Sequence, residues 1–483
     1  MIKSFISNSI GYFITNVISR GLSVVTLPIY TRMMSAEDFG SLDAIILFST
    51  LAGLVIPFGI SSGLARYYSE CKTKAEKIAL SSTVLNFTIF SSIVVLCLAF
   101  WLPDSVKASI LYSNDSELWL TISILIFLNC ILYQLQNLLR WQLEIKKYSY
   151  VSISVAVVTA GCSIFFLFAV DNSYKSILFG QIVGVLFGVV ISLKFAKQVL
   201  QITFSLSALK KVLLYSTPLV PAILFEFLAI NADRITIRYL LEESELGSYG
   251  VIYRIASLIL IINLAFTNAF GPVIINNYKK QAATSDTEFI IRVFIILQCT
   301  ILLALNGFQY HIISIFSGDN YYHASGLLPL IGISIALQSS YLLFPGIEIG
   351  YRTKLASVLQ FMWAILSLSF CFIGVRYFGI YGAPISIALA SSLYIASRVY
   401  FGQRHYFIPF EIKNLVYIIL AVFFLNIFLS ILMKSHNDIS NFIDFVILLI
   451  IIILSSIFIA AVGLKSHELI RITTFLRNGL GRG

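Results

Sequence analysis

An apolar segment near the N-terminus, residues 9–30, carries polar side chains along one side of a predicted helix. At about 100° per residue they fall within an arc of roughly 140°, while Ile14, Ile18 and Leu22 lie outside it. The polar set is Asn8, Ser9, Tyr12, Thr15, Asn16, Ser19, Arg20, Ser23 and Thr26. One side of this helix therefore faces lipid, and the other faces water or polar groups.

Arg20 lies about ten residues, or ~15 Å, from the start of this segment, too deep for its side chain to reach the membrane surface. A guanidinium left unpaired there costs at least ~2.5 kcal/mol, so an anionic partner is expected. We predict that Arg20 and Asn16 line a substrate cavity and that Arg20 binds an anionic ligand. The alternative is a structural ion pair with Asp43 or Glu226.

Residues 247–270 repeat this arrangement, because Gly250, Arg254, Ser257 and Asn268 share one helix face. We expect Arg254 and Ser257 to line the same cavity as Arg20. Arg254 is only seven residues from the outer end of its segment, so the alternative is a side chain that snorkels to the surface.

Glu226 and Asp233 lie seven residues apart, and therefore on one helix face, within and just after the predicted span 213–232. A carboxylate inside a membrane is a natural proton or sodium site, so we predict ion coupling or gating here, with Glu226 preferred for coupling. Asp43 joins this set from another span. The alternative for Asp233 and Arg234 is an interfacial ion pair that ends the helix. The sequence does not choose between a proton and a sodium gradient.

Arg66 follows the predicted span 42–64, beside two tyrosines and ahead of three lysines. The ordinary interpretation is positive-inside charge with an aromatic belt. The functional one is that Arg66 receives a lipid phosphate from the inner leaflet, since a guanidinium can bind it through two hydrogen bonds.

These side chains need elements that cross a membrane. The chain of 483 residues is 58% hydrophobic and 12% charged, with mean hydropathy +0.91, whereas a soluble domain is about a quarter charged. Apolar runs of ~20 residues predict an all-α polytopic membrane protein of about fourteen transmembrane helices. The spans are 9–30, 42–64, 80–102, 118–139, 150–170, 176–193, 213–232, 247–270, 289–315, 324–346, 356–375, 380–400, 414–433 and 442–463.

Basic residues alternate between the loops of this topology. By count, 24 of the 33 Lys and Arg residues lie in every second loop or at the termini, which predicts that both termini are cytoplasmic. The outer loops are acidic, and none exceeds about 15 residues. Loops this short disfavour a membrane glycosyltransferase or polymerase.

The segments 32–40 and 238–247 form a weak internal repeat. Each begins with an arginine, continues with an apolar pair, an acidic turn and an apolar residue, and ends with a glycine that is followed by a serine. Six spans separate the copies, so they share one orientation, as in parallel-repeat transporters. We predict two pseudo-symmetric six-helix lobes, 1–200 and 201–405, around a central cavity, followed by helices 13 and 14 with a cytoplasmic tail in 406–483.

Catalytic motifs are missing from the sequence. It holds no Walker sequence, and neither its five histidines nor its six cysteines show metal or redox spacing. The sequence predicts no metal and no cofactor. The net charge of +10 follows from the positive-inside rule, so no nucleic-acid partner is expected.

Short motifs carry a resemblance to a known family. Leu27-Pro-Ile-Tyr-Thr-Arg32, Asn231-Ala-Asp-Arg234 and Leu246-Gly-Ser-Tyr-Gly-Val-Ile-Tyr-Arg254 resemble the polysaccharide biosynthesis family of Wzx-type O-antigen flippases, in the MATE/MOP flippase superfamily. The resemblance implies a V-shaped, MATE-like fold in the bacterial inner membrane and an undecaprenyl-diphosphate-linked oligosaccharide as substrate. It also implies membrane lipids, a polysaccharide polymerase and chain-length proteins as partners in lipopolysaccharide biosynthesis. Arg20 and Arg254 match arginines of lipid II flippases, whereas the second span offers only Asp43.

The resulting hypothesis is a transporter, not an enzyme, which works by alternating access while Arg20 and Arg254 hold the diphosphate. The first alternative is a MATE-type cation-coupled multidrug exporter, which would place a carboxylate where this chain has Arg20. The second is a membrane polysaccharide polymerase.

Overall fold

The computed structural model is helical throughout the part of the chain that it describes, and no strand occurs there. The described residues are 2–68, 70–103, 107, 116–197, 200–201, 203–263, 266, 282–317, 319–350, 352–409, 421, 424–426 and 442–463. The predicted Asn268, most of the predicted span 414–433 and the tail from 464 onward lie outside them, as do the side chains of Asn8 and Ser9.

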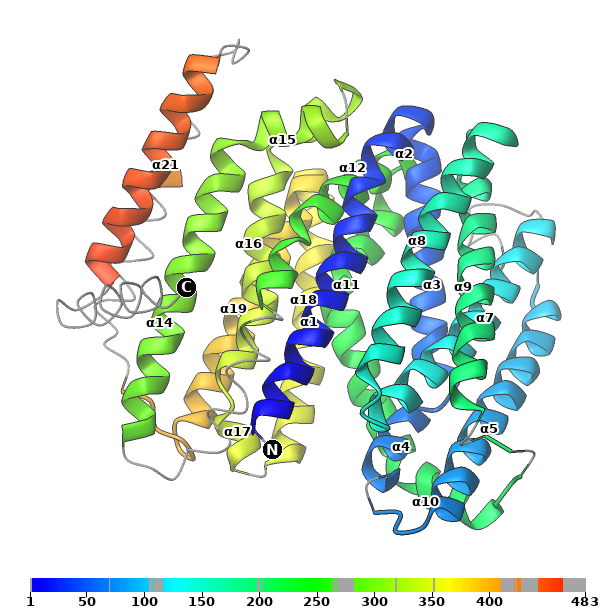
Figure 1. Cartoon of the computed structure of the whole chain (residues 1–483). Coiled ribbons are helices and arrows are strands. Elements are labelled where there is room, and N and C mark those ends of the chain that lie inside the picture. The colour runs from blue at the N-terminus through cyan, green and yellow to red at the C-terminus, as the bar shows by residue number, and fades with distance from the viewer. Residues whose placement is uncertain are drawn as a thin grey trace.

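The first group of helices fills one side of the molecule (Figure 1). It consists of α1 (Ile2–Val25), α2 (Leu27–Met33), α3 (Ala36–Val55), α4 (Ile60–Tyr68), α5 (Lys74–Phe100), α7 (Ser116–Trp141), α8 (Ile145–Ala169) and α9 (Tyr174–Ala196).

The remaining helices begin with α10 (Leu206–Ser216), η1 (Thr217–Leu219), α11 (Val220–Leu240) and α12 (Glu243–Ala256). They continue with α14 (Ala282–Gly307), α15 (Gln309–Phe316), η2 (Asp319–Ala324), α16 (Leu327–Ser340), η3 (Tyr341–Leu343), α17 (Gly346–Ile349), α18 (Thr353–Phe378), η4 (Gly379–Tyr381), α19 (Gly382–Gly402) and α21 (Phe442–Gly463).

Ten helical stretches among the described residues are long and apolar enough to cross a membrane, by length and composition. One of them, Lys354–Gly402, contains both α18 and α19, which pack side by side around η4. Two shorter apolar helices are Leu327–Leu343 and Leu448–Ile459. A polytopic, all-helical membrane protein is therefore confirmed, and the number fourteen stays a prediction.

Three of the long helices are interrupted at prolines. Pro28 lies in the first turn of α2, which follows α1 after a one-residue break. Pro57 precedes Phe58 and Gly59, whose positive φ angles of 50° and 61° separate α3 from α4. Pro218 lies in the 3-10 turn between α10 and α11. Proline lacks the amide hydrogen that an α-helix needs, so these breaks follow from sequence.

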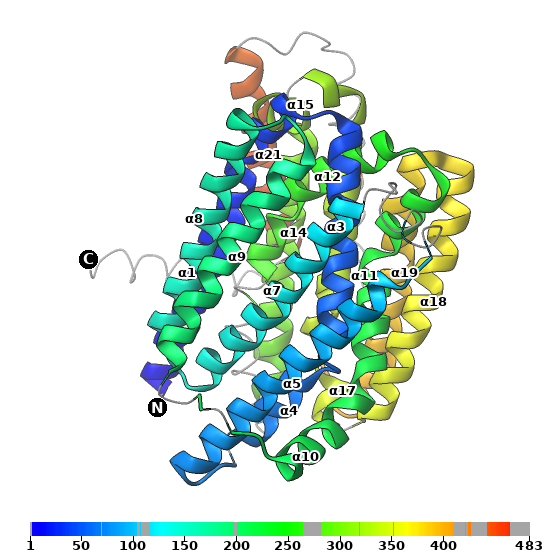
Figure 2. The same cartoon turned by 90° about the vertical axis from the view of Figure 1, so that its right-hand side faces the viewer.

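The two ends of the molecule differ in charge. The basic end, with α4, α10 and the start of α5, carries Lys72, Lys74, Lys77, Lys210 and Lys211, and the acidic end, with the starts of α3 and α12, carries Glu37, Asp38, Glu242, Glu243 and Glu245. Figure 2 shows α4 and α10 together at the basic end, although 137 residues separate the end of α4 at Tyr68 from the start of α10 at Leu206. Helix α10 packs on α4 and α5, so the chain following the first group returns to it before α11 begins.

At the acidic end, α3 and α12 meet backbone to backbone. A Cβ added to Gly40 would lie 2.0 Å from the Glu243 carbonyl oxygen, and one added to Gly247 would lie 1.7 Å from that of Ala36. The contact is reciprocal: Gly40 meets the carbonyl oxygen four residues before Gly247, and Gly247 meets the carbonyl oxygen four residues before Gly40. These are the glycines of the two repeat copies, so the copies lie against each other.

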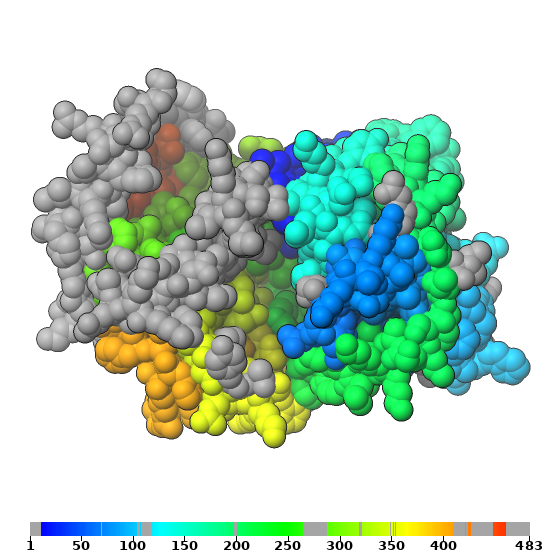
Figure 3. Space-filling model, turned by 60° about the horizontal axis from the view of Figure 1, so that its bottom comes forward, coloured from blue at the N-terminus to red at the C-terminus, as the bar shows by residue number. Residues whose placement is uncertain are grey.

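Apolar side chains seal the same contact. Phe39 and Leu42 of α3 and Tyr249 of α12 are fully buried in one core cluster, and the Ser41 hydroxyl donates to the Glu243 carboxylate over 2.9 Å. Seen from the basic end, by contrast, a recess lies between the first group and the helices around α18 (Figure 3). The two groups are therefore joined at the acidic end, whereas at the basic end α10 packs on α4 and the recess separates the first group from the helices around α18. The predicted lobe boundaries at 200 and 405 stay a prediction.

Candidate functional site

A cavity of about 510 Å³ lies between the two groups of helices, at the level of the second turn of α3. Helices α1, α3, α8 and α9 line it from one side, and α11 and α12 from the other. Its charged lining consists of Arg20, Asp43, Arg234 and Arg254. Three cationic side chains and one carboxylate give this cavity a positive balance inside the apolar part of the protein.

Arg20 lies on α1, where the predicted polar face turns toward the cavity. Ser19, Ser23 and Thr26 line the cavity beside it, while Ile14 and Ile18 are exposed on the outside of the helix. No ion pair forms between Arg20 and any described carboxylate; Asp43, one of its predicted partners, pairs with Arg234 instead. Arg20 therefore does not form the structural ion pair with Asp43 that was the alternative to ligand binding.

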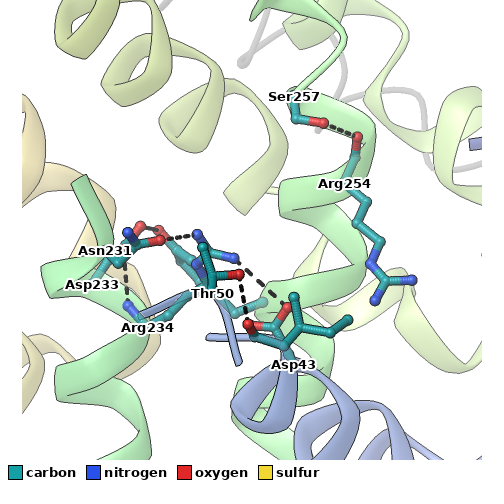
Figure 4. A network of polar contacts seen from close by, with 9 residues as sticks. Asp43, Thr50, Asn231, Asp233, Arg234, Arg254 and Ser257 are labelled. Carbon is teal, nitrogen blue, oxygen red and sulfur yellow. Dashed lines mark hydrogen bonds and ion pairs between the residues drawn. The ribbon is translucent and has the colours of Figure 1, made fainter. Parts of the chain in front are cut away.

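Arg254 reaches the same cavity from α12. Its guanidinium lies 4.8 Å from the Phe39 ring centroid, a cation–π contact, and forms no ion pair with a described carboxylate. Ser257, one turn on, donates a hydrogen bond of 2.7 Å to the Arg254 carbonyl and also lines the cavity. In Figure 4 no dashed contact reaches the Arg254 guanidinium, which stands apart from the network around Arg234.

Arg234 is held by groups from both sides of the cavity. Its guanidinium lies 3.7 Å from the Asp43 carboxylate of α3, donates to the Asn231 side chain, and stacks 4.2 Å from the Tyr253 ring centroid. Both charged side chains are nearly buried. Breaking such a pair from one side costs about 3–5 kcal/mol, because it leaves a buried charge without compensation. Asp43 and Arg234 therefore tie α3 to α11.

Asp233 belongs to this network without lining the cavity. It is fully buried, accepts 2.6 Å from the Tyr249 hydroxyl of α12, and accepts 2.8 Å from the backbone N–H of Arg234. The predicted interfacial pair of Asp233 and Arg234 is thus replaced by two separate side-chain partnerships, Asp233 with Tyr249 and Arg234 with Asp43. Glycine at 250 lets α12 approach, since an added Cβ would lie 3.2 Å from the Asp43 carboxyl carbon.

Three predicted residues lie elsewhere. Glu226 of α11 accepts a hydrogen bond of 2.9 Å from the Tyr341 hydroxyl and is outside the cavity lining. Arg66 lies at the basic end on α4, 3.5 Å from the Glu70 carboxylate. Asn16 is one turn of α1 before Arg20, half-buried and outside the lining. The structure therefore brings together Arg20, Arg254, Ser257, Asp43 and Arg234.

Tyr253 is a cavity residue that the sequence did not single out, because a tyrosine beside an arginine in a membrane helix is an ordinary pattern. Arg234 was assigned to gating, and its place in the cavity depends on α11 packing against α3, which no local pattern encodes. No group of three or more described His, Cys, Asp or Glu residues is arranged to hold a metal ion.

The cavity can bind a polyanion. Guanidinium groups bind phosphate through paired, charge-assisted hydrogen bonds, which strengthen where water is scarce. Arg20 and Arg254 are available for this, and Arg234 adds positive charge while Asp43 fixes its position. A cationic ligand would meet net repulsion in the same space.

The fold is shared with solved membrane transporters. One is lipid II flippase MurJ in an inward closed conformation, with TM-score 0.69, 14% identity, 95% of this chain covered and 99% of that one. Inward-facing and outward-facing MATE-family multidrug transporters of the MOP superfamily each give a TM-score of 0.58, at 12% and 16% identity. They cover 83% of this chain and 94% and 95% of their own. No curated protein matches the sequence.

Residues 5–278 of the sequence also match the family model described as polysaccharide biosynthesis protein. That range covers more than half of the chain and includes Arg20, Asp43, Arg234 and Arg254. The predicted membership of the polysaccharide biosynthesis family is thus confirmed, and the predicted MATE-like fold is the one that the solved transporters share. This chain belongs to the polysaccharide biosynthesis protein family.

Proposed function

We propose that the protein is a flippase that carries an undecaprenyl-diphosphate-linked oligosaccharide, such as an O-antigen repeat unit, across the bacterial inner membrane by alternating access. The observation that carries this proposal is the pair of guanidinium groups, Arg20 and Arg254, which line a cavity within the membrane and form no ion pair with a described carboxylate. A diphosphate supplies the anionic partner that their depth requires.

The proposed direction follows from charge and shape. The basic end faces the cytoplasm under the positive-inside rule, which places both termini there. The recess between the helix groups opens toward this end, and the reciprocal glycine contact closes the other. In this state the cavity receives substrate from the cytoplasmic leaflet. Arg66, exposed at the basic end, is the proposed first contact for the lipid phosphate.

In the cavity, Arg20 and Arg254 hold the diphosphate while the polyprenyl chain stays in the lipid between the helix groups. The Asp43–Arg234 pair keeps the third guanidinium in place and partly neutralised, which limits the affinity and allows release. The released unit is then the substrate of a polymerase and of chain-length proteins, the proposed partners.

Energy coupling is proposed to use a proton or a sodium gradient. Glu226 is the preferred coupling carboxylate, since its side-chain partner among the described residues is the neutral Tyr341 hydroxyl, and Asp233 is the second candidate. Protonation or sodium binding would neutralise the negative charge at either carboxylate inside the membrane.

Replacement of Arg20 tests the proposal. In the Arg20→Ala variant we expect surface polysaccharide to be lost while the protein still reaches the membrane in normal amount. Arg376→Ala, at an exposed position on α18, is the matched control and should export normally. Normal surface polysaccharide in Arg20→Ala cells would refute the assignment. Lost resistance to cationic drugs with intact polysaccharide would favour the multidrug-exporter alternative.

A further inference from the structure

A second cavity adjoins the arginine cavity on the side of the first helix group. It measures about 390 Å³ and is formed by α3, α7 and α9. Ile46 and Gln181 line both cavities, so the two spaces are neighbours. The second space therefore extends the arginine cavity into the first group.

The lining of this second cavity is polar but uncharged. Its polar members are Ser49, Thr50, Asn129, Tyr133 and Gln181, and no Lys, Arg, Asp or Glu occurs among the described residues that line it. Amides and hydroxyls donate and accept hydrogen bonds at the same time, as sugar hydroxyls do. The Tyr133 ring adds a flat apolar surface on which a sugar ring can pack.

The polar residues recur at helical spacing. Leu125, Asn129 and Tyr133 are each four residues apart on α7, so they form one face. On α3, Ser49, Thr50 and Gly53 lie on the face that also carries Ile46. Gly53 leaves open space, because an added Cβ would meet nothing within 4 Å. Helices α3 and α7 thus turn polar faces toward the same open space.

Several of these groups have no internal partner. The Ser49 hydroxyl oxygen is buried without a hydrogen bond, and no described residue bonds to the side chains of Asn129, Tyr133 or Gln181. Polar groups inside a membrane protein are normally paired, since no bulk water can satisfy them there. Their donors and acceptors are therefore available to a ligand with hydroxyl and amide groups.

The two cavities are placed for one ligand. Asp43 marks the arginine cavity on α3, and Thr50 marks the second cavity seven residues later, about 10 Å along the helix axis. A diphosphate at the arginines and the sugar attached to it can occupy both spaces together. We infer that the cavity between α3, α7 and α9 binds the first sugar residues of the lipid-linked glycan, and that these sugars are neutral.

This inference rests on the proposed function, so its test separates the two. The purified full-length protein is titrated with two probes: bare undecaprenyl diphosphate, and undecaprenyl diphosphate bearing a neutral N-acetylhexosamine disaccharide. The variants are Asn129→Leu, which removes an amide at similar side-chain size, and Tyr133→Phe, which removes only a hydroxyl; neither residue lines the arginine cavity. Gln136→Met, on α7 outside the cavity, is the matched control.

Loss of one sugar hydrogen bond predicts that each cavity variant binds the disaccharide lipid about tenfold more weakly. The same variants should bind the bare diphosphate within twofold of the unmodified protein, which also shows that they are folded. Arg20→Ala should weaken both probes, and Gln136→Met neither. Equal losses for both probes in the cavity variants, or no loss for the disaccharide lipid, would overturn the sugar site.

A third probe tests the neutral-sugar assignment. A uronic acid at the first sugar position should bind at least several-fold more weakly than the N-acetylhexosamine, because no described cation lines the second cavity. Tighter binding of the uronic acid would overturn the assignment. If the unmodified protein binds neither the bare nor the sugar-bearing diphosphate, the proposed function itself fails, and the sugar site fails with it.

Discussion

Substitution of Gly247 by alanine should open the acidic end of the protein. The added Cβ would lie 1.7 Å from the Ala36 carbonyl oxygen, half of the 3.4 Å at which ordinary van der Waals contact begins. The obstacle is backbone, so it cannot rotate away as a side chain could. Helices α3 and α12 must therefore separate at this point.

The size of the effect follows from the cost of overpacking. Forcing a methyl group into a filled contact typically costs about 1–3 kcal/mol. If that cost falls on the closed form and not on the form in which α3 and α12 have parted, the equilibrium moves toward the open form by about 5- to 150-fold. Gly247 does not line the arginine cavity, so substrate recognition itself should be unaffected.

A cysteine at Thr26 can report this change. Thr26 lines the arginine cavity and is only 5% exposed, so a membrane-impermeant maleimide applied at the acidic end should react slowly in a protein whose native cysteines are replaced. With Gly247→Ala we expect labelling at least about fivefold faster. Gly161→Ala is the matched control, since its Cβ would meet nothing within 4 Å. Unchanged labelling of folded Gly247→Ala protein would refute the idea that this contact keeps the acidic end closed.

Two further predictions concern the buried ion pair and the basic end. Asp43→Asn should destabilise the protein by about 3–5 kcal/mol in unfolding measurements in detergent, because Arg234 loses its carboxylate partner. The double variant Asp43→Leu, Arg234→Met, which removes both charges, should recover most of this loss. An equal loss of stability in the single and double variants would contradict the role of the ion pair. Burial raises the pKa of the Cys71 thiol, so maleimide labelling at neutral pH should be slow and should rise as pH passes the ordinary thiol range. Labelling of Cys71 by the membrane-impermeant maleimide should also require permeabilised cells. Labelling of Cys71 in intact cells would contradict the cytoplasmic placement of the basic end.

Periodicity along single helices predicted part of the site. The polar face of residues 9–30 pointed to Arg20, and the face shared by Arg254 and Ser257 pointed to the same cavity, where both now lie. These inferences needed only the angle between successive residues of one helix and the cost of charge in lipid. The helix interruptions at Pro28, Pro57 and Pro218 are likewise local, since each follows from a proline's missing amide hydrogen.

Contacts between distant helices could not be predicted in this way. Asp43 pairs with Arg234, Asp233 with Tyr249, and Glu226 with Tyr341, and each pair joins two helices whose relative rotation the sequence leaves open. The neutral cavity escaped notice for another reason. Ser49, Asn129 and Gln181 belong to three different spans, and only packing brings them together.

The pairing of Asp43 with Arg234 has a consequence for the making of the protein. Arg234 follows Asp43 by 191 residues, so at about 5–20 residues per second a ribosome needs roughly 10–40 s to supply it. Until then Asp43 of α3 lacks the guanidinium that compensates its charge, and a buried charge without a partner destabilises the helix that carries it. The ion pair can form only once both helix groups are inserted. The Asp43–Arg234 pair therefore stabilises only the final assembly of the two groups, in which the first half of the chain recognises the second.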